Sequence, residues 1–198
     1  MGTMTALARP DVGLHPSWAA AVLDFGSEQI HGSGSWEVAE QWRGDTTEAS
    51  CRVHVETLRD RGDPSLEQPV NRVLCDYFWV VEGAGDSGDS GDPGDLGDPG
   101  DPGGAGEVVG FLAVRHTLNA FLLQSGGHIG YSVRPSRRRE GHASRALGLG
   151  LDHLRGLGVP RALLTVHDDN AGSRRVVEAA GGVYESSFDA LRRYWIDL

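Results

Sequence analysis

Residues 128–135 (His-Ile-Gly-Tyr-Ser-Val-Arg-Pro), followed by 136–143 (Ser-Arg-Arg-Arg-Glu-Gly-His-Ala), are the segment from which the fold can be inferred. Tyr131 and Val133 favour an extended strand, and the proline at its end has no N–H with which to continue a ladder. After the turn, apolar residues recur at helical spacing and form one stripe, made by Ala143, Leu147, Leu151 and Leu154. The segment predicts a strand, a polar turn and an amphipathic helix that ends before Pro160.

The turn before this helix has the features of an anion-binding site. Gly141 lets a ligand approach the backbone, and the amides of Ala143 and Ser144 lie in the first helical turn, where N–H groups have no intrahelical partner. The helix dipole adds a partial positive charge, and phosphate binds readily at such a helix start. Three arginines at 137–139 add cations beside it. The sequence therefore predicts a phosphate-bearing ligand.

Two common phosphate-binding motifs are absent from this turn. No G-x-x-x-x-G-K-[ST] run occurs, which excludes a P-loop, and no G-x-G-x-x-G follows a strand here. Arg138-x-x-Gly141-x-Ala143 instead resembles the acyl-CoA pyrophosphate loop of GNAT superfamily N-acetyltransferases, whose pattern is [QR]-x-x-G-x-[GA]. Asn170-x-x-Ser173 resembles a second landmark of that family, an Asn-x-x-Ser that opens a helix after a strand. Wider phrases such as 127–131 look like a bacterial branch of predicted acetyltransferases.

The resemblance implies an α/β (α+β) fold with a mixed, mostly antiparallel central sheet of about six to seven strands, flanked by helices. The sheet would splay at the cofactor site, between the strand that contains Tyr131 and the strand 161–166. Acetyl-CoA is the implied cosubstrate, with its pantetheine arm in that gap. The implied cofactor-binding residues are Tyr131, Ser132, Val133, Arg138, Arg139, Gly141, His142, Ala143, Ser144, Asn170 and Ser173.

The activity that the resemblance implies is acetyl transfer to a primary amine, by direct attack in a ternary complex. His128 lies near the place where related enzymes carry a base, although a packed histidine is the alternative. The tyrosine that often protonates the thiolate in this family is replaced by Val177, which leaves Tyr184, Tyr131 or water as the acid. This departure keeps open a second function, a non-catalytic acyl-CoA-binding or sensing module.

Length and charge limit the classes of partner. The chain of 198 residues fits one domain, and its formal net charge of −10 argues against nucleic acid and against an anionic membrane. No apolar run approaches membrane length, and no secretory signal is visible, so we expect a cytoplasmic protein. Cys51 and Cys75 are expected to be reduced thiols, with no metal site. The expected acceptor is a small-molecule or protein amine, and the expected state is a monomer or homodimer.

Further elements can be placed along the chain. We expect a first strand in 3–9, a helix from Pro16, a second helix from Thr46 to about Arg59, and a short helix in 118–124. The segments 72–81 and 107–117 predict an antiparallel hairpin, and 183–188 with 191–197 predict a second one. In the first hairpin, Val109, Phe111, Ala113 and Arg115 are expected on one face, against Val108, Leu112 and Val114. Trp36, Glu40 and Trp42 either line the acceptor pocket or serve packing.

The segment 85–104 repeats Gly-Asp-X with a glycine at every third position. Its six aspartates carry most of the net charge, because −10 less −6 leaves −4 for the rest of the chain. We expect a disordered insertion at about 84–105, since such a loop closes cheaply between two strands. A calcium-binding loop and a collagen-like assembly are the alternatives, and stacked like charges argue against the second.

Overall fold

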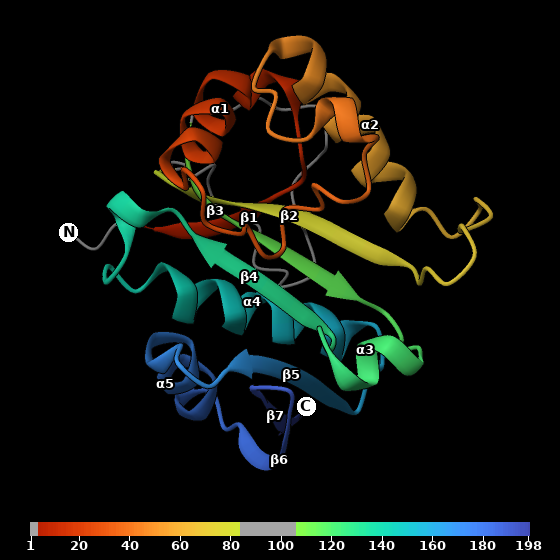
Figure 1. Ribbon diagram of the computed structural model, residues 1–198, viewed down its shortest axis with the longest axis vertical. Coiled ribbons are helices and arrows are strands. Elements are labelled where there is room, and N and C mark those ends of the chain that lie inside the picture. Colours follow the sequence, from red (N-terminus) through yellow and green to blue (C-terminus); the bar gives the residue numbers. More distant parts are fainter. Residues whose placement is uncertain (1–3, 84–105) are drawn as a thin grey trace.

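The computed structural model describes residues 4–83 and 106–198 (Figure 1). The expected insertion at 84–105 lies outside the described residues. The strands are β1 (Thr5–Ala8), β2 (Cys75–Glu82), β3 (Glu107–Arg115), β4 (Ile129–Val133), β5 (Arg161–His167), β6 (Val183–Phe188) and β7 (Leu191–Asp197). The α-helices are α1 (His15–Asp24), α2 (Glu48–Gly62), α3 (Ala120–Gln124), α4 (His142–Gly156) and α5 (Ala171–Ala179). Single 3-10 turns are η1 (Val12–Leu14), η2 (Glu40–Trp42) and η3 (Pro135–Arg137).

The strands form two antiparallel sheets, one in the order β1-β2-β3-β4 and one in the order β5-β7-β6. Figure 1 shows α1 and α2 over one face of the larger sheet, with α4 on its other face and α5 beside β5. The predicted hairpins β2–β3 and β6–β7 are confirmed, as are the first strand and the two N-terminal helices. No helix in the described residues is both long and apolar enough to cross a bilayer.

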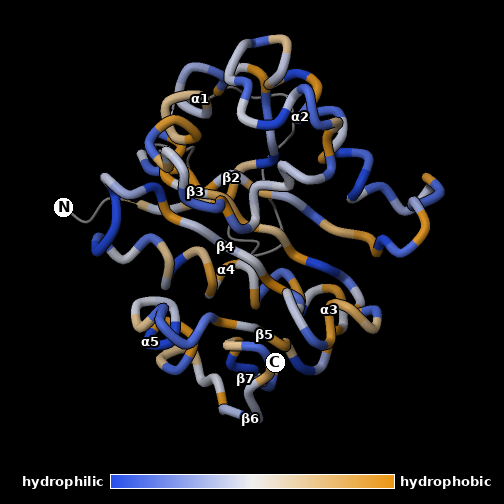
Figure 2. Tube along the Cα trace, in the orientation of Figure 1, coloured by the Kyte–Doolittle hydropathy of each residue, from blue (hydrophilic) through white to orange (hydrophobic). Residues whose placement is uncertain are grey.

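Helix α4 joins the two sheets through one apolar face. Its buried residues include Ala146, Leu147, Leu151 and Leu154, which pack in one cluster with side chains of β3, β4 and β5. Each buried leucine contributes about 2 kcal/mol of transfer free energy. Gly150 brings the helix close to the sheet, because a Cβ there would lie 3.3 Å from methyl groups of Ile129 and Leu112. The predicted stripe is confirmed except at Ala143, which is only partly buried. Figure 2 shows this apolar layer between the polar outer surfaces.

The predicted faces of β3 are wrong at its first residues. The register with β2 shifts between Val80 and Val81, so that Val80 pairs with Gly110 and Val81 with Val108. The bulge places Val109 on the α4 face with Leu112, and Val108 on the α1 face with Phe111. Strict alternation fails here because a bulge adds one residue to one strand and reverses the side-chain order beyond it.

β4 and β5 touch at one end only. A single bridge joins Gly127 to Leu164, and the His128 amide donates to the Leu163 carbonyl at 2.7 Å. Beyond that point the two strands diverge (Figure 1) and end beside the first residues of α4 and α5. The expected splay is present. The apolar run at 161–166 belongs to β5, which is the edge of the smaller sheet and is covered by α4 and α5.

The joint between the sheets depends on a residue without a side chain. Gly127 has φ +63°, and a Cβ there would lie 2.2 Å from the Leu163 carbonyl oxygen. Gly158 also has a positive φ, of +76°, but its Cβ would meet nothing within 4 Å. We predict that Gly158→Ala lowers the free energy of unfolding by only the left-handed backbone penalty, about 1 kcal/mol. Gly127→Ala should lower it by about 3 kcal/mol or more, because it also breaks the joint.

Denaturant unfolding of the two variants measures the difference. Equal losses in free energy for Gly127→Ala and Gly158→Ala would contradict the close approach of these backbones.

Candidate active site

A cavity of about 650 Å³ lies where β4 and β5 diverge. Its wall comes from six parts of the chain: the loop after α1, the adjoining ends of β2 and β3, α3 with the residues that flank it, the strand β4, the passage from β5 into α5, and the turn between β6 and β7. The polar side chains that line it are His31, Glu37, Arg72, Arg115, Tyr131, Thr165, His167, Asn170, Ser173 and Asp189, among others. One compartment therefore connects the predicted cofactor strand with the N-terminal part of the chain.

Three of the residues implied by the sequence meet in this cavity. Asn170 is the N-cap of α5, and its Oδ1 accepts from the Ser173 amide at 2.9 Å. The Ser173 hydroxyl lies 2.8 Å from the Tyr131 hydroxyl, which reaches across the gap from β4. Burial raises the pKa of Tyr131 above its ordinary value, although the hydrogen bond to Ser173 opposes this. The phenol is therefore protonated at neutral pH and can donate a proton.

The turn between β4 and α4 presents free backbone amides. Gly141 is the N-cap of α4 with φ +87°, and no side chain caps this helix. Arg139 also has a positive φ, of 69°. Among the described residues, none of the amides from 139 to 144 donates to a backbone carbonyl in a turn or loop. These N–H groups and the dipole of a 15-residue helix favour an anion at this point.

The arginines of this turn do not all face a ligand. Arg137 contacts the carboxylates of Glu82, Glu107 and Glu140, and Arg138 pairs with Glu28 at 2.6 Å. Arg138 also donates from Nε to the Val133 carbonyl at 3.1 Å.

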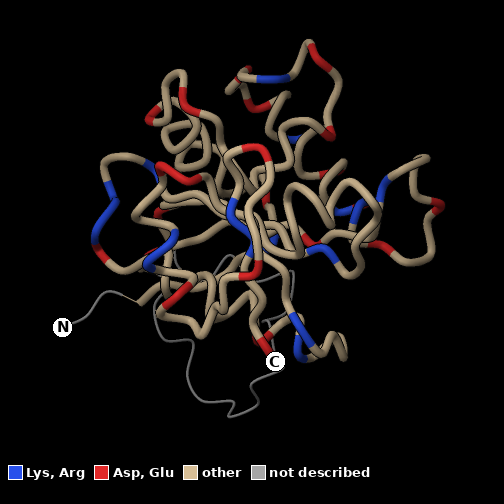
Figure 3. Tube along the Cα trace, turned by 60° about the horizontal axis from the view of Figure 1, so that its bottom comes forward, with Lys and Arg blue, Asp and Glu red and all other residues tan. Residues whose placement is uncertain are grey.

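These contacts mean that Arg137 and Arg138 brace the turn. Arg139 is exposed and makes no ion pair with any described residue. The guanidinium of Arg145 lies against Gly141 and donates to the Glu140 carbonyl at 3.1 Å. Figure 3 shows the basic run in the loop at the left of the molecule.

Two sets of contacts hold the turn in place. Asp24, at the end of α1, accepts from the Ser136 hydroxyl at 2.6 Å and from Arg134 Nε at 2.9 Å. These hydrogen bonds, that from the Ser136 side chain first, lower the pKa of Asp24 to about 2. His142 is buried, with Nδ1 2.9 Å from the Thr5 hydroxyl and Nε2 3.3 Å from Glu140. Its side chain anchors the helix start to β1, so only its backbone is available to a ligand.

His128 lies at the joint between the sheets and does not line the cavity. It is 6% exposed, and its Nδ1 accepts from the Leu163 amide at 2.9 Å. Burial, with a smaller contribution from the Arg115 charge, lowers the pKa of His128 to about 4. Since Nδ1 is already bonded and the ring is such a weak base, this geometry disagrees with His128 as the proton acceptor and fits the alternative of a packed histidine.

Tyr184 is also away from the cavity. It is 51% exposed on the edge strand β6, where its hydroxyl lies 3.1 Å from the Ser187 hydroxyl. Val177, which takes the place of the family's usual tyrosine, is completely buried in the main core. Of the three acids that the sequence left open, Tyr131 is the tyrosine that the structure brings to the cavity.

Sequence analysis did not single out His31. Its loop packs onto β4, because Gly32 has φ +81° and a Cβ there would lie 2.4 Å from the Gly130 carbonyl oxygen. The His31 ring lies 6.4 Å from the His167 ring, centroid to centroid, so the two imidazoles face each other across the cavity. His31 as a whole is exposed, but partial desolvation of its ring in the cavity, followed by the charges of His167 and Arg115, lowers its pKa below the ordinary value. His31 is therefore a neutral imidazole at pH 7, and the glycines of 32–34 were the one hint of a tightly packed loop.

The remaining pocket candidates have different fates. Trp36 lines the cavity, whereas Glu40 and Trp42 lie in η2 and do not. Glu37 lies inside the cavity with its charge already paired, by Arg61 at 2.8 Å and Arg72 at 3.5 Å. Of the three residues predicted from the sequence to line the acceptor pocket, only Trp36 lines the cavity.

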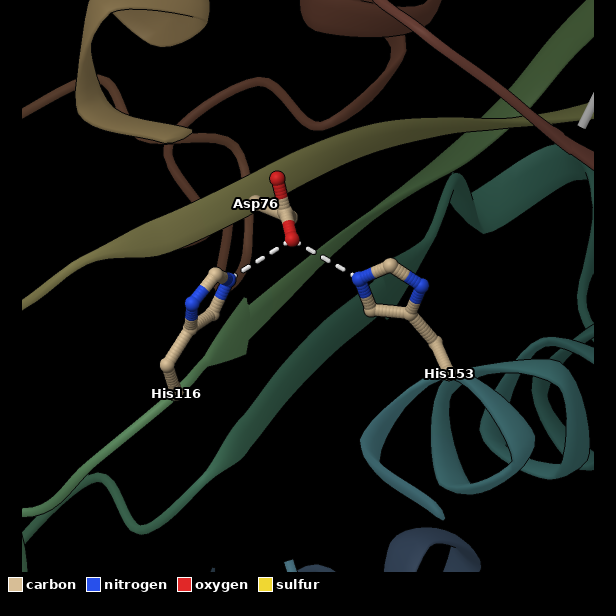
Figure 4. Close-up of side chains that lie close together, drawn as sticks. All are labelled: Asp76, His116 and His153. Carbon is tan, nitrogen blue, oxygen red and sulfur yellow. Dashed lines mark hydrogen bonds and ion pairs between the residues drawn. The ribbon is translucent and has the colours of Figure 1, made fainter. Parts of the chain in front are cut away.

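A second polar cluster lies on the α4 side of the larger sheet (Figure 4). His116 and His153 each donate from Nε2 to one oxygen of Asp76 at 2.7 Å, and Arg9 donates to the other oxygen at 2.7 Å. Burial alone would raise the pKa of Asp76, but these three hydrogen bonds outweigh it and lower the pKa far below its ordinary value. The distances are those of hydrogen bonds, shorter than the roughly 3.3 Å between two ligands of one tetrahedral metal. The cluster ties α4 to β2 and β3.

These features define what the site can do chemically. An anion can bind at the start of α4, and an extended arm can lie between the diverging strands. A neutral imidazole and a protonated phenol line the same cavity. This set can hold two reactants together, accept one proton and donate another.

Comparison with known proteins points to the family that the sequence motifs resemble. Residues 101–183 match the family described as acetyltransferase (GNAT) domain. No curated protein matches the sequence of this chain.

Solved structures share the fold at low sequence identity. Mycobacterium smegmatis RimJ in complex with CoA-disulfide is 19% identical with a TM-score of 0.61, over 100% of this chain and 90% of that one. The microcin C7 self-immunity acetyltransferase MccE, in complex with acetyl-CoA and AMP, is 10% identical with a TM-score of 0.59, over 98% and 92% of the two chains. A putative ribosomal-protein-serine acetyltransferase from Vibrio cholerae is 13% identical with a TM-score of 0.58, over 98% and 94%.

The anion site gives a direct prediction. Gly141→Val should weaken binding of acetyl-CoA at least about tenfold, because a β-branched residue is strained at this positive φ and covers the helix start. Gly148→Val is the matched control, since it lies in the same helix and a Cβ there meets nothing within 4 Å. Isothermal titration of both variants makes the comparison. Unchanged affinity in Gly141→Val would contradict the assignment of this turn.

The buried histidine gives a prediction about pH. The pKa of His128 is 6.5 when unfolded and about 4 when folded, so its contribution to stability is complete above pH 6.5 and is lost as the pH falls towards 4. Linkage sets this contribution at roughly 3 kcal/mol at most. His128→Asn keeps an acceptor for the Leu163 amide but does not titrate. The wild type should lose more unfolding free energy than this variant between pH 7 and pH 4, and parallel curves would refute the assignment.

Proposed function

Because this chain belongs to the GNAT acetyltransferase superfamily, we propose that it is an acetyl-CoA-dependent N-acetyltransferase. In this proposal the acetyl group passes to a primary amine by direct attack within a ternary complex. The observation that carries it is one cavity in which Tyr131 from β4 and Ser173 from α5 meet His31 from the loop after α1. An acyl carrier and an acceptor can reach each other there.

The residues present fit acetyl-CoA. The amides of 139–144, with Arg139 and Arg145 beside them, would hold the diphosphate. β4 is an edge strand, so its backbone groups that face β5 are available to a pantetheine arm in the gap. Asn170 and Ser173 line the same gap. When bound, acetyl-CoA supplies an acyl thioester that is already activated, so no covalent enzyme intermediate is required.

We assign the proton transfers to two side chains. His31 accepts the proton of the attacking amine, because its lowered pKa keeps the ring neutral and it lines the cavity. Tyr131 donates a proton to the leaving thiolate, with its hydroxyl oriented by Ser173. Backbone amides of β4 that face the gap stabilise the developing oxyanion.

The acceptor is a primary amine of a small molecule or of a protein. The Vibrio cholerae neighbour is described as acting on a ribosomal-protein serine, whereas MccE was solved with a nucleotide. The cavity volume of about 650 Å³ suits a small molecule or the end of a polypeptide.

A second function, a non-catalytic acyl-CoA sensor, is favoured by one observation, the loss of the usual tyrosine to buried Val177. Tyr131 offsets this loss, since it brings a phenol to the cavity from another element. Turnover of acetyl-CoA with a broad amine panel, followed by released thiol, separates the two. Sustained release that requires an amine supports the enzyme, and tight acetyl-CoA binding without release on any amine supports the sensor.

The assignment of the base is tested by two histidine variants. We predict that His31→Gln lowers kcat by about 100-fold, the usual contribution of a general base, and leaves the affinity for acetyl-CoA unchanged. His128→Asn should keep kcat within about threefold of the wild type at a temperature where it is folded, because the ring lies outside the cavity. The opposite pattern would restore His128 as the base.

A further inference from the structure

We propose that the acceptor carries a carboxylate and that Arg115 binds this carboxylate inside the cavity. The inference rests on the proposed acetyltransferase function and names the class of its second substrate. That class is the amino-carboxylic acids, in which a primary amine and a carboxylate belong to one small molecule.

Arg115 is a buried cation without an acidic partner. It is 7% exposed and is the only arginine that is buried among residues 4–83 and 106–198. Its Nη1 donates to the carbonyls of Gly126 and Gly127, at 3.3 and 3.0 Å. Within the same residues it makes no ion pair and no other side-chain hydrogen bond. The charge is therefore left uncompensated by this part of the chain.

Other shielded arginines of this protein are treated differently. The side chains of Arg61, Arg134 and Arg137 are 18%, 13% and 20% exposed, and each has at least one carboxylate partner. Glu37 is a buried carboxylate of the same cavity, but it already pairs with two arginines and accepts from the Tyr77 hydroxyl at 3.3 Å. Arg115 thus differs from the rule that the rest of the structure follows.

An arginine in this position cannot avoid the cost of a buried charge by losing its proton. A buried lysine or histidine would become neutral, but the guanidinium stays charged at any physiological pH. An unpaired buried charge costs several kcal/mol. Nε and Nη2 of Arg115 have no hydrogen-bond partner among the described residues, but they are not fully enclosed by protein. Because Arg115 lines the cavity, these donors face the cavity. Two N–H groups in a planar fork match the two oxygens of a carboxylate.

The position of Arg115 points to the acceptor and not to the diphosphate. Arg115 is the last residue of β3, and its amide donates to the His128 carbonyl just before β4 begins. The Gly141 turn follows the other end of β4, and the five residues of that strand span about 17 Å. Gly130 keeps the space beside the guanidinium free, since a Cβ there would lie 3.7 Å from Nη2. The free donors therefore lie at the acyl end of the gap.

Matched pairs of acceptors test the inference. Each natural amino acid is compared with its amide, at rates normalised to the neutral amine fraction, because the amide has the less basic amine. For at least one pair, the wild type should favour the carboxylate by about tenfold or more in kcat/KM. Arg115→Met should remove this preference, and Arg115→Lys should keep part of it. Arg72→Met is the matched control, because it removes a cavity arginine that already has a carboxylate partner, and it should leave the preference intact.

A readout at the other end of the site separates the possible failures. The rise in Tm with acetyl-CoA should be the same in all four proteins, which shows that each variant is folded and binds the cofactor. Two results would overturn this inference and leave the proposed function standing. In the first, the wild type acetylates amines but does not prefer the amino acid over its amide. In the second, the wild type has this preference and Arg115→Met keeps it. If no amine is acetylated, the proposed function fails. In that case the binding of amino acids, measured as a rise in Tm, tests whether Arg115 binds a carboxylate. A Tm rise with amino acids that Arg115→Met abolishes would support it, and no such rise would end it.

Discussion

The separation of β4 from β5 is the constraint on which the rest of this structure depends. The two strands are held together at Gly127 and Leu164 and by His128, then diverge towards the first residues of α4 and α5. The divergence leaves one edge of β4 without a ladder, and it opens the cavity that Tyr131 and Ser173 line. It also places two helix N-termini beside the open end. A continuous sheet of seven strands would have none of these features.

Polar contacts around this gap divide into those that fix the framework and those that remain available. Asp24, Glu28 and the glutamates around Arg137 fix the β4–α4 turn, and Asp76 ties α4 to the larger sheet. The groups that remain are the amides at the start of α4, His31, and the guanidinium of Arg115. The amides lie at the start of α4, whereas His31 and Arg115 line the cavity. That arrangement suits a long anionic cofactor followed by a small acceptor.

Much of this fold follows from local sequence patterns. Pro135 ends a strand, Thr47 and Asn170 cap helices, and the β-branched and aromatic runs in 72–81 and 107–117 mark a hairpin, because each signal acts within a few residues. The uncapped helix start was predictable for the same reason, as Gly141 and the amides that follow it are neighbours in the chain. The faces of β3 were not, since a bulge leaves no local mark. Nor were the roles of His128, His31 and Arg115, which depend on contacts between segments far apart in sequence.

The central claim is that coenzyme A lies in this gap with its diphosphate at the start of α4. A crystal structure of the protein with acetyl-CoA tests it most directly. The account predicts diphosphate oxygens within hydrogen-bond distance of the amides in 139–144, and the pantetheine arm between β4 and β5 beside Tyr131. A nucleotide bound elsewhere, or a helix start capped by the protein's own side chains in the complex, would contradict it.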